Sequence, residues 1–189
     1  MFLRIALTAG ILWQMSACTT KVYFTTAMRH MLEQKKVELT RLQFYVDRDV
    51  ELIRVVHSSQ AATNAGKVRM ENGKYINIID LPKGTSGICT KADSGIVHIS
   101  FEVGDGRFLP FVAEQKTSGD RFYVLQTQGD SSKVDYAGNR YTARTFSQYE
   151  QSVGRGTQAR LMVKKSQINK MTVDRRKMSG RRVDRKSVV

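Results

Sequence analysis

The chain contains little cysteine and little proline, and each scarcity argues against a class of protein. Its two cysteines, Cys18 and Cys89, are too few for a disulfide framework. Its two prolines argue against a proline-rich linker of the kind that spans a cell wall. The apolar run from Ile5 to Trp13 is shorter than the roughly 20 residues that a membrane-spanning helix needs.

The sequence also lacks the common catalytic and metal-binding motifs. Its three histidines, His30, His57 and His98, do not stand in HxxxH or HExxH spacing, and no CxxC occurs, so no zinc site is indicated. The G-x-S-x-G motif of hydrolases, the P-loop and G-x-G-x-x-G are missing as well. A serine or cysteine nucleophile paired with a distant histidine is the alternative that these absences leave open.

The acidic residues offer no better case for catalysis. Asp47 and Asp49 flank Arg48 in a predicted turn, and Glu102 and Asp105 lie near another turn, where acids are ordinary residues. A glycosidase pair would need two carboxylates from separate elements on either side of a bond. We therefore predict a protein that is not an enzyme, with no catalytic residue, no metal site and no cofactor.

The start of the chain has the pattern of a secretory signal. A basic residue, Arg4, precedes the apolar run, and small residues lead into a cysteine in Ser16-Ala17-Cys18. This segment resembles the signal of bacterial lipoproteins, whose lipobox ends in small residues before an invariant cysteine. The resemblance covers about the first 20 residues, with Met15 where the family usually has leucine. The alternative is an ordinary signal peptide, or a short buried helix, with a coincidental cysteine.

The resemblance implies how and where the protein is held. Residues 1–17 would be removed, and Cys18 would carry acyl chains on its sulfur and on its amine as the first mature residue. Many lipoproteins retained at the inner membrane have aspartate at the next position, so Thr19 implies the outer membrane, facing the periplasm. Two acyl chains anchor stably where one is marginal. Small lipoproteins also occur in multi-protein machines such as secretion systems, which implies a non-enzymatic scaffold or assembly subunit with envelope proteins as partners.

Positive charge is concentrated toward the C-terminus of a chain whose net charge is +14. Residues 155–189 hold twelve lysines and arginines but only two acids. In a cytosolic protein this would suggest nucleic acid, which we do not expect behind a lipoprotein signal. Lipid phosphates, anionic cell-wall polymers or an acidic protein remain as partners, and protection of an edge strand is the structural alternative. The predicted contacts to an anionic partner are Lys164, Lys165, Lys170, Arg175, Arg176, Lys177, Arg181 and Arg182.

We expect four segments along the chain. They are a signal peptide over 1–17, a lipidated tether over 18–24, a β-rich globular domain over 25–165, and a basic C-terminal strand or tail over 166–189. The globular domain is predicted to begin with one short helix over roughly 26–36, capped by Thr25 or Thr26.

Alternating apolar and polar residues after this helix predict many short strands. They are expected at 42–46, 50–56, 68–70, 75–81, 87–91, 96–103, 107–112, 121–125, 134–136, 140–143, 159–164 and 171–183. Asn72-Gly73 between two of them is a strong hairpin signal. The pattern indicates an all-β barrel or sandwich, and Gly84-Thr85-Ser86-Gly87 loosely resembles the opening of SH3-like barrels. Cys89 is expected to be a small buried residue in a strand, with a reactive thiol as the alternative.

Overall fold

A computed structural model describes residues 20–56, 67–114, 119–129, 132–146 and 158–172, together with Met178. The predicted signal and Cys18 lie outside the described residues. So do five of the eight predicted contacts to an anionic partner, namely Arg175, Arg176, Lys177, Arg181 and Arg182.

Two antiparallel sheets form an all-β sandwich, which confirms the predicted fold class. In spatial order, the seven-stranded sheet contains β1 (Lys21–Tyr23), β12 (Leu161–Lys164), β2 (Gln43–Val46), β6 (Ser86–Asp93), β7 (Ile96–Ser100), β8 (Leu109–Ala113) and β9 (Tyr123–Leu125). The five-stranded sheet contains β10 (Lys133–Tyr136), β11 (Asn139–Phe146), β3 (Asp49–Val56), β5 (Lys74–Leu81) and β4 (Lys67–Glu71). Two helices, α1 (Thr26–Gln34) and α3 (Lys165–Thr172), and a short 3₁₀ turn, η1 (Leu39–Arg41), complete the described elements.

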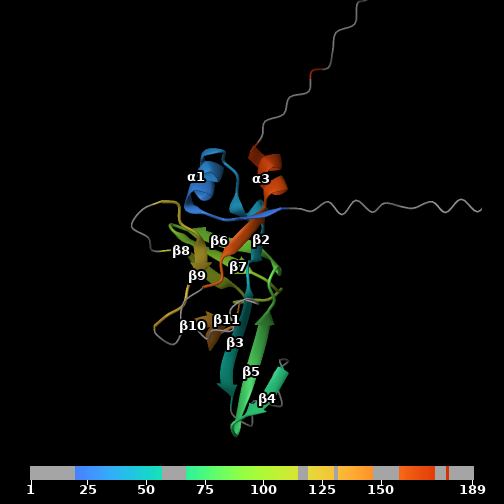
Figure 1. Cartoon of the computed structure of the whole chain (residues 1–189), viewed down its shortest axis with the longest axis vertical. Helices are drawn as coiled ribbons and strands as arrows, with labels where there is room; N and C mark the ends of the chain where they lie inside the picture. The colour runs from blue at the N-terminus through green and yellow to red at the C-terminus, as the bar shows by residue number, and fades with distance from the viewer. Residues whose placement is uncertain are drawn as a thin grey trace, which may run out of the picture.

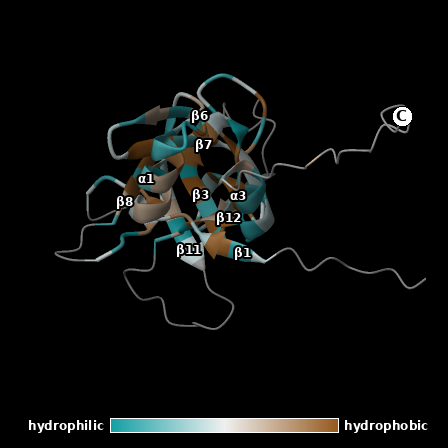
Figure 2. Cartoon of the chain, turned by 90° about the horizontal axis from the view of Figure 1, so that it is seen from above, coloured by the Kyte–Doolittle hydropathy of each residue, from teal (hydrophilic) through white to brown (hydrophobic). Residues whose placement is uncertain are grey.

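The seven-stranded sheet curls back toward its first strands. The backbone N–H of Leu125 in β9 donates to the carbonyl of Ala159, at 2.8 Å, just before β12. The N–H of Tyr123 donates to the carbonyl of Phe24, at 3.2 Å. Apolar side chains of both sheets fill one continuous core, and in Figure 2 the brown segments of β3, β7 and β12 lie in the middle of the molecule.

Acidic side chains hold the short link by which the chain passes from β2 to β3. Asp47 accepts from the backbone N–H of Arg160, at 2.7 Å, and its carboxylate lies 3.1 Å from the guanidinium of Arg48. Asp49 accepts from the backbone N–H of Lys83, at 2.6 Å. These contacts give both aspartates structural roles at the turn, as predicted.

Strands β3, β5 and β4 form an arm that extends away from the two helices (Figure 1). The arm's tip is the predicted Asn72-Gly73 turn, whose φ values of +49° and +73° are the left-handed conformations of a type I′ hairpin. At the opposite end, Thr25 caps α1 by accepting from the N–H of Met28 at 3.2 Å, and Leu32 of this helix is fully buried.

Two predicted boundaries are wrong. The tether was expected to reach residue 24, but Lys21–Tyr23 pair with β12 and Phe24 is fully buried. The C-terminal strand was expected to begin at Met171, which instead lies in α3, a second helix that the prediction missed. The reason is that Ile168 and Met171, three positions apart, both pack on the core from one helix face.

Candidate functional site

Among the predicted contacts to an anionic partner, Lys164 lies beside a second lysine on a neighbouring strand. In the register of β1 and β12 it lies opposite Lys21. The two ammonium groups lie 5.5 and 4.3 Å from the centre of the Tyr45 ring, close enough for cation–π attraction. We call Lys21, Tyr23, Tyr45 and Lys164 the lysine–tyrosine face. Counting charge in the C-terminal region could not find Lys21, which lies at the other end of the chain.

Lys165 and Lys170 are exposed on helix α3. Because they are five residues apart in an α-helix, their side chains lie about 140° apart around its axis and do not share one face. The helix is fixed by Gln167, which accepts from the N–H of Gln43 at 3.2 Å and donates to the carbonyl of Arg41 at 3.1 Å. The structure therefore places Lys165 next to Lys164 but separates Lys170 from both.

The thiol of Cys89 and the imidazoles of His30 and His98 are held in structural contacts, and His57 lies outside the described residues. Cys89 is buried, as predicted, and its thiol donates to the carbonyl of Lys91 at 3.4 Å. Burial raises the pKa of this thiol, which keeps it protonated and unreactive. His30 is hydrogen-bonded to Gln34 at 3.0 Å, and His98 stacks on Phe108. Within the described ranges, no group of three or more metal-ligating side chains gathers.

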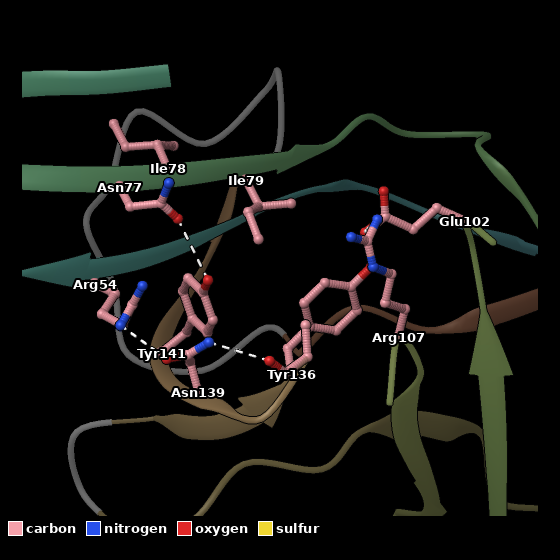
Figure 3. Close-up of a pocket in the computed structure, with 10 residues that line it drawn as sticks. Arg54, Asn77, Ile78, Ile79, Glu102, Arg107, Tyr136, Asn139 and Tyr141 are labelled. Atoms are coloured by element: carbon pink, nitrogen blue, oxygen red, sulfur yellow. Dashed lines mark hydrogen bonds and ion pairs between the residues drawn. The ribbon is translucent and has the colours of Figure 1, made fainter. Parts of the chain in front are cut away.

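A polar cleft of about 380 Å³ lies between the five-stranded sheet and the loop that follows β7. Its side chains come from strands far apart in the sequence, and Figure 3 shows arginines at its two ends with tyrosines between them. The polar and aromatic lining residues are Arg54, Asn77, Glu102, Arg107, Tyr136, Asn139 and Tyr141.

One end of the cleft is organised around Arg54. Its Nη1 donates to the side-chain oxygen of Asn139 at 2.8 Å, and its guanidinium lies 5.6 Å from the centre of the Tyr141 ring. The Tyr141 hydroxyl donates to the side-chain oxygen of Asn77 at 3.3 Å. Asn77 is 4% exposed, so this amide is a buried polar group that its neighbours hold in place.

Glu102 organises the other end. The Tyr136 hydroxyl donates to Oε1 of Glu102 at 2.5 Å, and Nη1 of Arg107 lies 3.3 Å from the same oxygen. Burial, together with the charge of Glu102, raises the pKa of the Tyr136 hydroxyl far above its ordinary value. Tyr136 is therefore a hydrogen-bond donor at neutral pH and not a base.

The sequence reasoning missed this cleft, although two residues signal it. Along β3 the inward positions hold Val50, Leu52 and then Arg54, where the alternation calls for an apolar residue. Along β5 Asn77 breaks the same pattern, and the register places it directly opposite Arg54. Two polar residues that face each other on the inner side of a sheet indicate a site or a polar network.

The outer side of the same sheet carries a second, cationic surface. Around a cavity of about 630 Å³ lie Lys74, Lys133, Arg140 and Arg144, and Arg54 of the polar cleft lines this cavity as well. Arg140 is paired with Asp135 at 3.0 Å, and Lys133 donates to the hydroxyl of Thr142 at 2.7 Å. The three described members of the predicted C-terminal set, Lys164, Lys165 and Lys170, do not line this cavity.

The chain matches no protein-family model, and comparison with curated proteins and with solved structures finds no match either. Among the described residues, no helix has both the length and the apolar character needed to cross a bilayer.

Proposed function

We propose that this protein is a lipoprotein of the outer membrane, facing the periplasm, that serves as a non-enzymatic scaffold or assembly subunit of an envelope complex. The lipobox-like Ser16-Ala17-Cys18 supports lipidation. The observation that carries the proposal is the position of Thr20, whose carbonyl accepts from the N–H of Lys165 at 3.0 Å. Thr20 is two residues from Cys18, so at most about 7 Å of chain separates the acylated residue from the folded body.

The lysine–tyrosine face lies where such an anchor would hold it against lipid headgroups. Lys21 and Lys164 supply positive charge for lipid phosphates, at about 1 kcal/mol for each cation near an anionic surface. Tyr23 is 40% exposed beside them, and tyrosine favours the boundary between headgroups and hydrocarbon. Charge and aromatic character together support a membrane-facing role for this end of the molecule.

Mass spectrometry of the mature N-terminus tests lipidation directly. We expect a chain that begins at Cys18 with acyl groups on its sulfur and amine, and globomycin should block its maturation. Cys18→Ala is the control and should release the protein from the membrane fraction. A mature chain with an unmodified N-terminus at any other residue would refute the anchor.

Vesicle flotation tests the lysine–tyrosine face separately, with the unacylated Cys18→Ser chain. Lys21→Glu combined with Lys164→Glu should weaken binding to phosphatidylglycerol vesicles by at least about tenfold, whereas phosphatidylcholine vesicles should bind neither form. Lys74→Glu, an exposed lysine near the tip of the arm, is the control. Equal losses from the double reversal and from the control would contradict a membrane-facing role for this face.

A second candidate is a cell-wall or anionic-lipid binding module that uses the basic C-terminal region. The exposed lysines Lys165 and Lys170 on α3 support it. Isolated cell wall should retain the protein, and reversing the charge of Arg175, Arg176 and Lys177 should release it. If the amount of protein bound to cell wall changed neither with these substitutions nor with added salt, the contact would not be electrostatic.

A further inference from the structure

The Arg54 end of the cleft holds a charged donor that lacks an acceptor. Nη1 of Arg54 is bonded to Asn139, but its Nε is buried and has no hydrogen-bond partner in the structure as described. The neighbouring amide oxygen, Oδ1 of Asn77, already accepts from Tyr141. Buried polar groups are almost always satisfied in folded proteins, so an orphaned guanidinium N–H indicates an acceptor that arrives from outside.

The opposite end leaves spare donors as well. Oε1 of Glu102 already receives the Tyr136 hydroxyl and lies against Arg107. Arginine has five N–H donors, and one arginine nitrogen serves this ion pair. Among the described lining residues, two arginines and one glutamate give the cleft a net charge of +1. The cleft therefore favours a ligand with hydrogen-bond acceptors and one negative charge.

We propose that this cleft binds a small ligand that carries one carboxylate, joined through an amide to an aromatic or apolar group. A guanidinium presents N–H groups in a plane that matches a carboxylate, and one carboxylate balances the net charge. The rings of Tyr136 and Tyr141 lie between the two arginines (Figure 3) but are buried. The half-buried side chains of Ile78 and Ile79 also line the cleft and give an apolar group a surface to pack on. The Glu102–Arg107 pair offers an amide both an acceptor and a donor.

This inference goes beyond the scaffold role and does not depend on lipidation. The cleft lies between the five-stranded sheet and the loop after β7, and its lining contains no residue of the lysine–tyrosine face. A volume of about 380 Å³ is at the small end of the range for ligand pockets, which suits a fragment of this size.

An NMR titration of the full chain with benzoylglycine tests the proposal, because this probe carries a carboxylate, an amide and an aromatic ring. We expect saturable shifts of backbone signals in β3, β5 and β11 around the cleft. The matched control is benzoylglycinamide, which differs by the loss of the carboxylate charge and should bind at least about tenfold more weakly. Equal binding of the two probes, or no saturable binding, would overturn the proposal.

Paired substitutions locate the site. Arg54→Gln should weaken benzoylglycine binding by at least about tenfold, because it removes the charged fork. Arg144→Gln removes the same charge from the outer face of the same sheet and should leave binding unchanged. If both variants lost the same amount of benzoylglycine affinity, or if the NMR shifts were confined to the outer surface of the sheet, the assignment of the ligand to the cleft would be wrong. Displacement of benzoylglycine by an equal concentration of inorganic phosphate would also overturn it.

Arg107→Gln gives a second reading if Arg54→Gln fails to fold. Its side chain lies in an exposed loop, so the fold should survive, as a thermal unfolding curve can verify. Benzoylglycine should then bind several-fold more weakly while benzoylglycinamide changes less. Unchanged discrimination between the two probes in Arg107→Gln, with normal folding, would show that the cleft charge does not select the carboxylate.

Discussion

Replacing Phe24 with alanine measures how firmly the start of the folded body is packed. The ring is fully buried and meets Phe44 edge-on at 5.1 Å and Tyr123 at 5.0 Å between ring centres. Truncating a buried phenylalanine costs about 3–5 kcal/mol, and lost aromatic pairs favour the upper part of that range. We expect the free energy of unfolding to fall by about 4 kcal/mol, a large share of the roughly 5–15 kcal/mol of a typical domain.

Urea unfolding followed by far-UV circular dichroism measures this loss. With a slope of about 2 kcal/mol per molar urea, the midpoint should fall by about 2 M. Tyr23→Ala is the matched control, since it removes a neighbouring aromatic residue that is 40% exposed. That control should cost about 1–2 kcal/mol, well below Phe24→Ala, because its ring is partly exposed and packs on Phe122, at 5.1 Å between ring centres, and beside Arg160.

Two results would refute this reasoning. If Phe24→Ala and Tyr23→Ala cost the same small amount, residues 21–24 would behave as a tether and β1 would contribute little to the fold. If the slope of the urea transition fell together with the midpoint, the substitution would have changed how cooperatively the chain unfolds, and the simple loss of a packed ring would not explain the result.

Three further predictions address the arm, the pH dependence and the membrane. Gly73→Ala places a side chain at φ +73° in the hairpin and should lower stability by about 1 kcal/mol in the same urea assay, whereas a stabilised variant would contradict the turn assignment. Burial opposes ionisation of Asp120, but hydrogen bonds from the start of α1 outweigh it and hold its pKa below the ordinary value. The stability that Asp120 contributes is present above its unfolded pKa of about 3.9 and is lost as pH falls through its lower folded pKa. The melting temperature of Asp120→Asn should therefore decrease less at acidic pH than that of the unmodified protein. Thr19→Asp should move the protein from the outer to the inner membrane fraction on a sucrose gradient, and an unchanged distribution would contradict the localisation.

Local sequence patterns predicted the strands well because both sheets have a buried and an exposed side. The alternation in Val50–Val56 and Tyr75–Leu81 gave β3 and β5 within one residue, and Asn72-Gly73 marked their neighbouring hairpin. The same reasoning failed at Lys21–Tyr23, since three residues are too few to show a period. That strand exists because β12 offers it a partner from the other end of the chain.

The cleft depends on pairings that no local pattern contains. The inward positions of Arg54 and Asn77 could have been noticed, but their direct opposition follows from the register of β3 with β5. Tyr141 joins them through the pairing of β11 with β3, and Glu102 comes from a loop of the other sheet. The sequence analysis predicted contacts at the C-terminal lysines and arginines because their density along the chain is high. The cleft has a small net charge, so no local excess of charged residues in the sequence indicates it.

The pairing of Lys21 with Lys164 also sets the order in which the molecule can be completed. Among the described strands β1 pairs only with β12, so this pairing must wait until residues 161–164 have been made. Such distant pairings form late because closing a long loop costs entropy before the contact repays it. Under the lipoprotein proposal, Cys18 would therefore stay accessible to the acylating enzymes throughout export. The final folding step would then draw the body onto the bilayer.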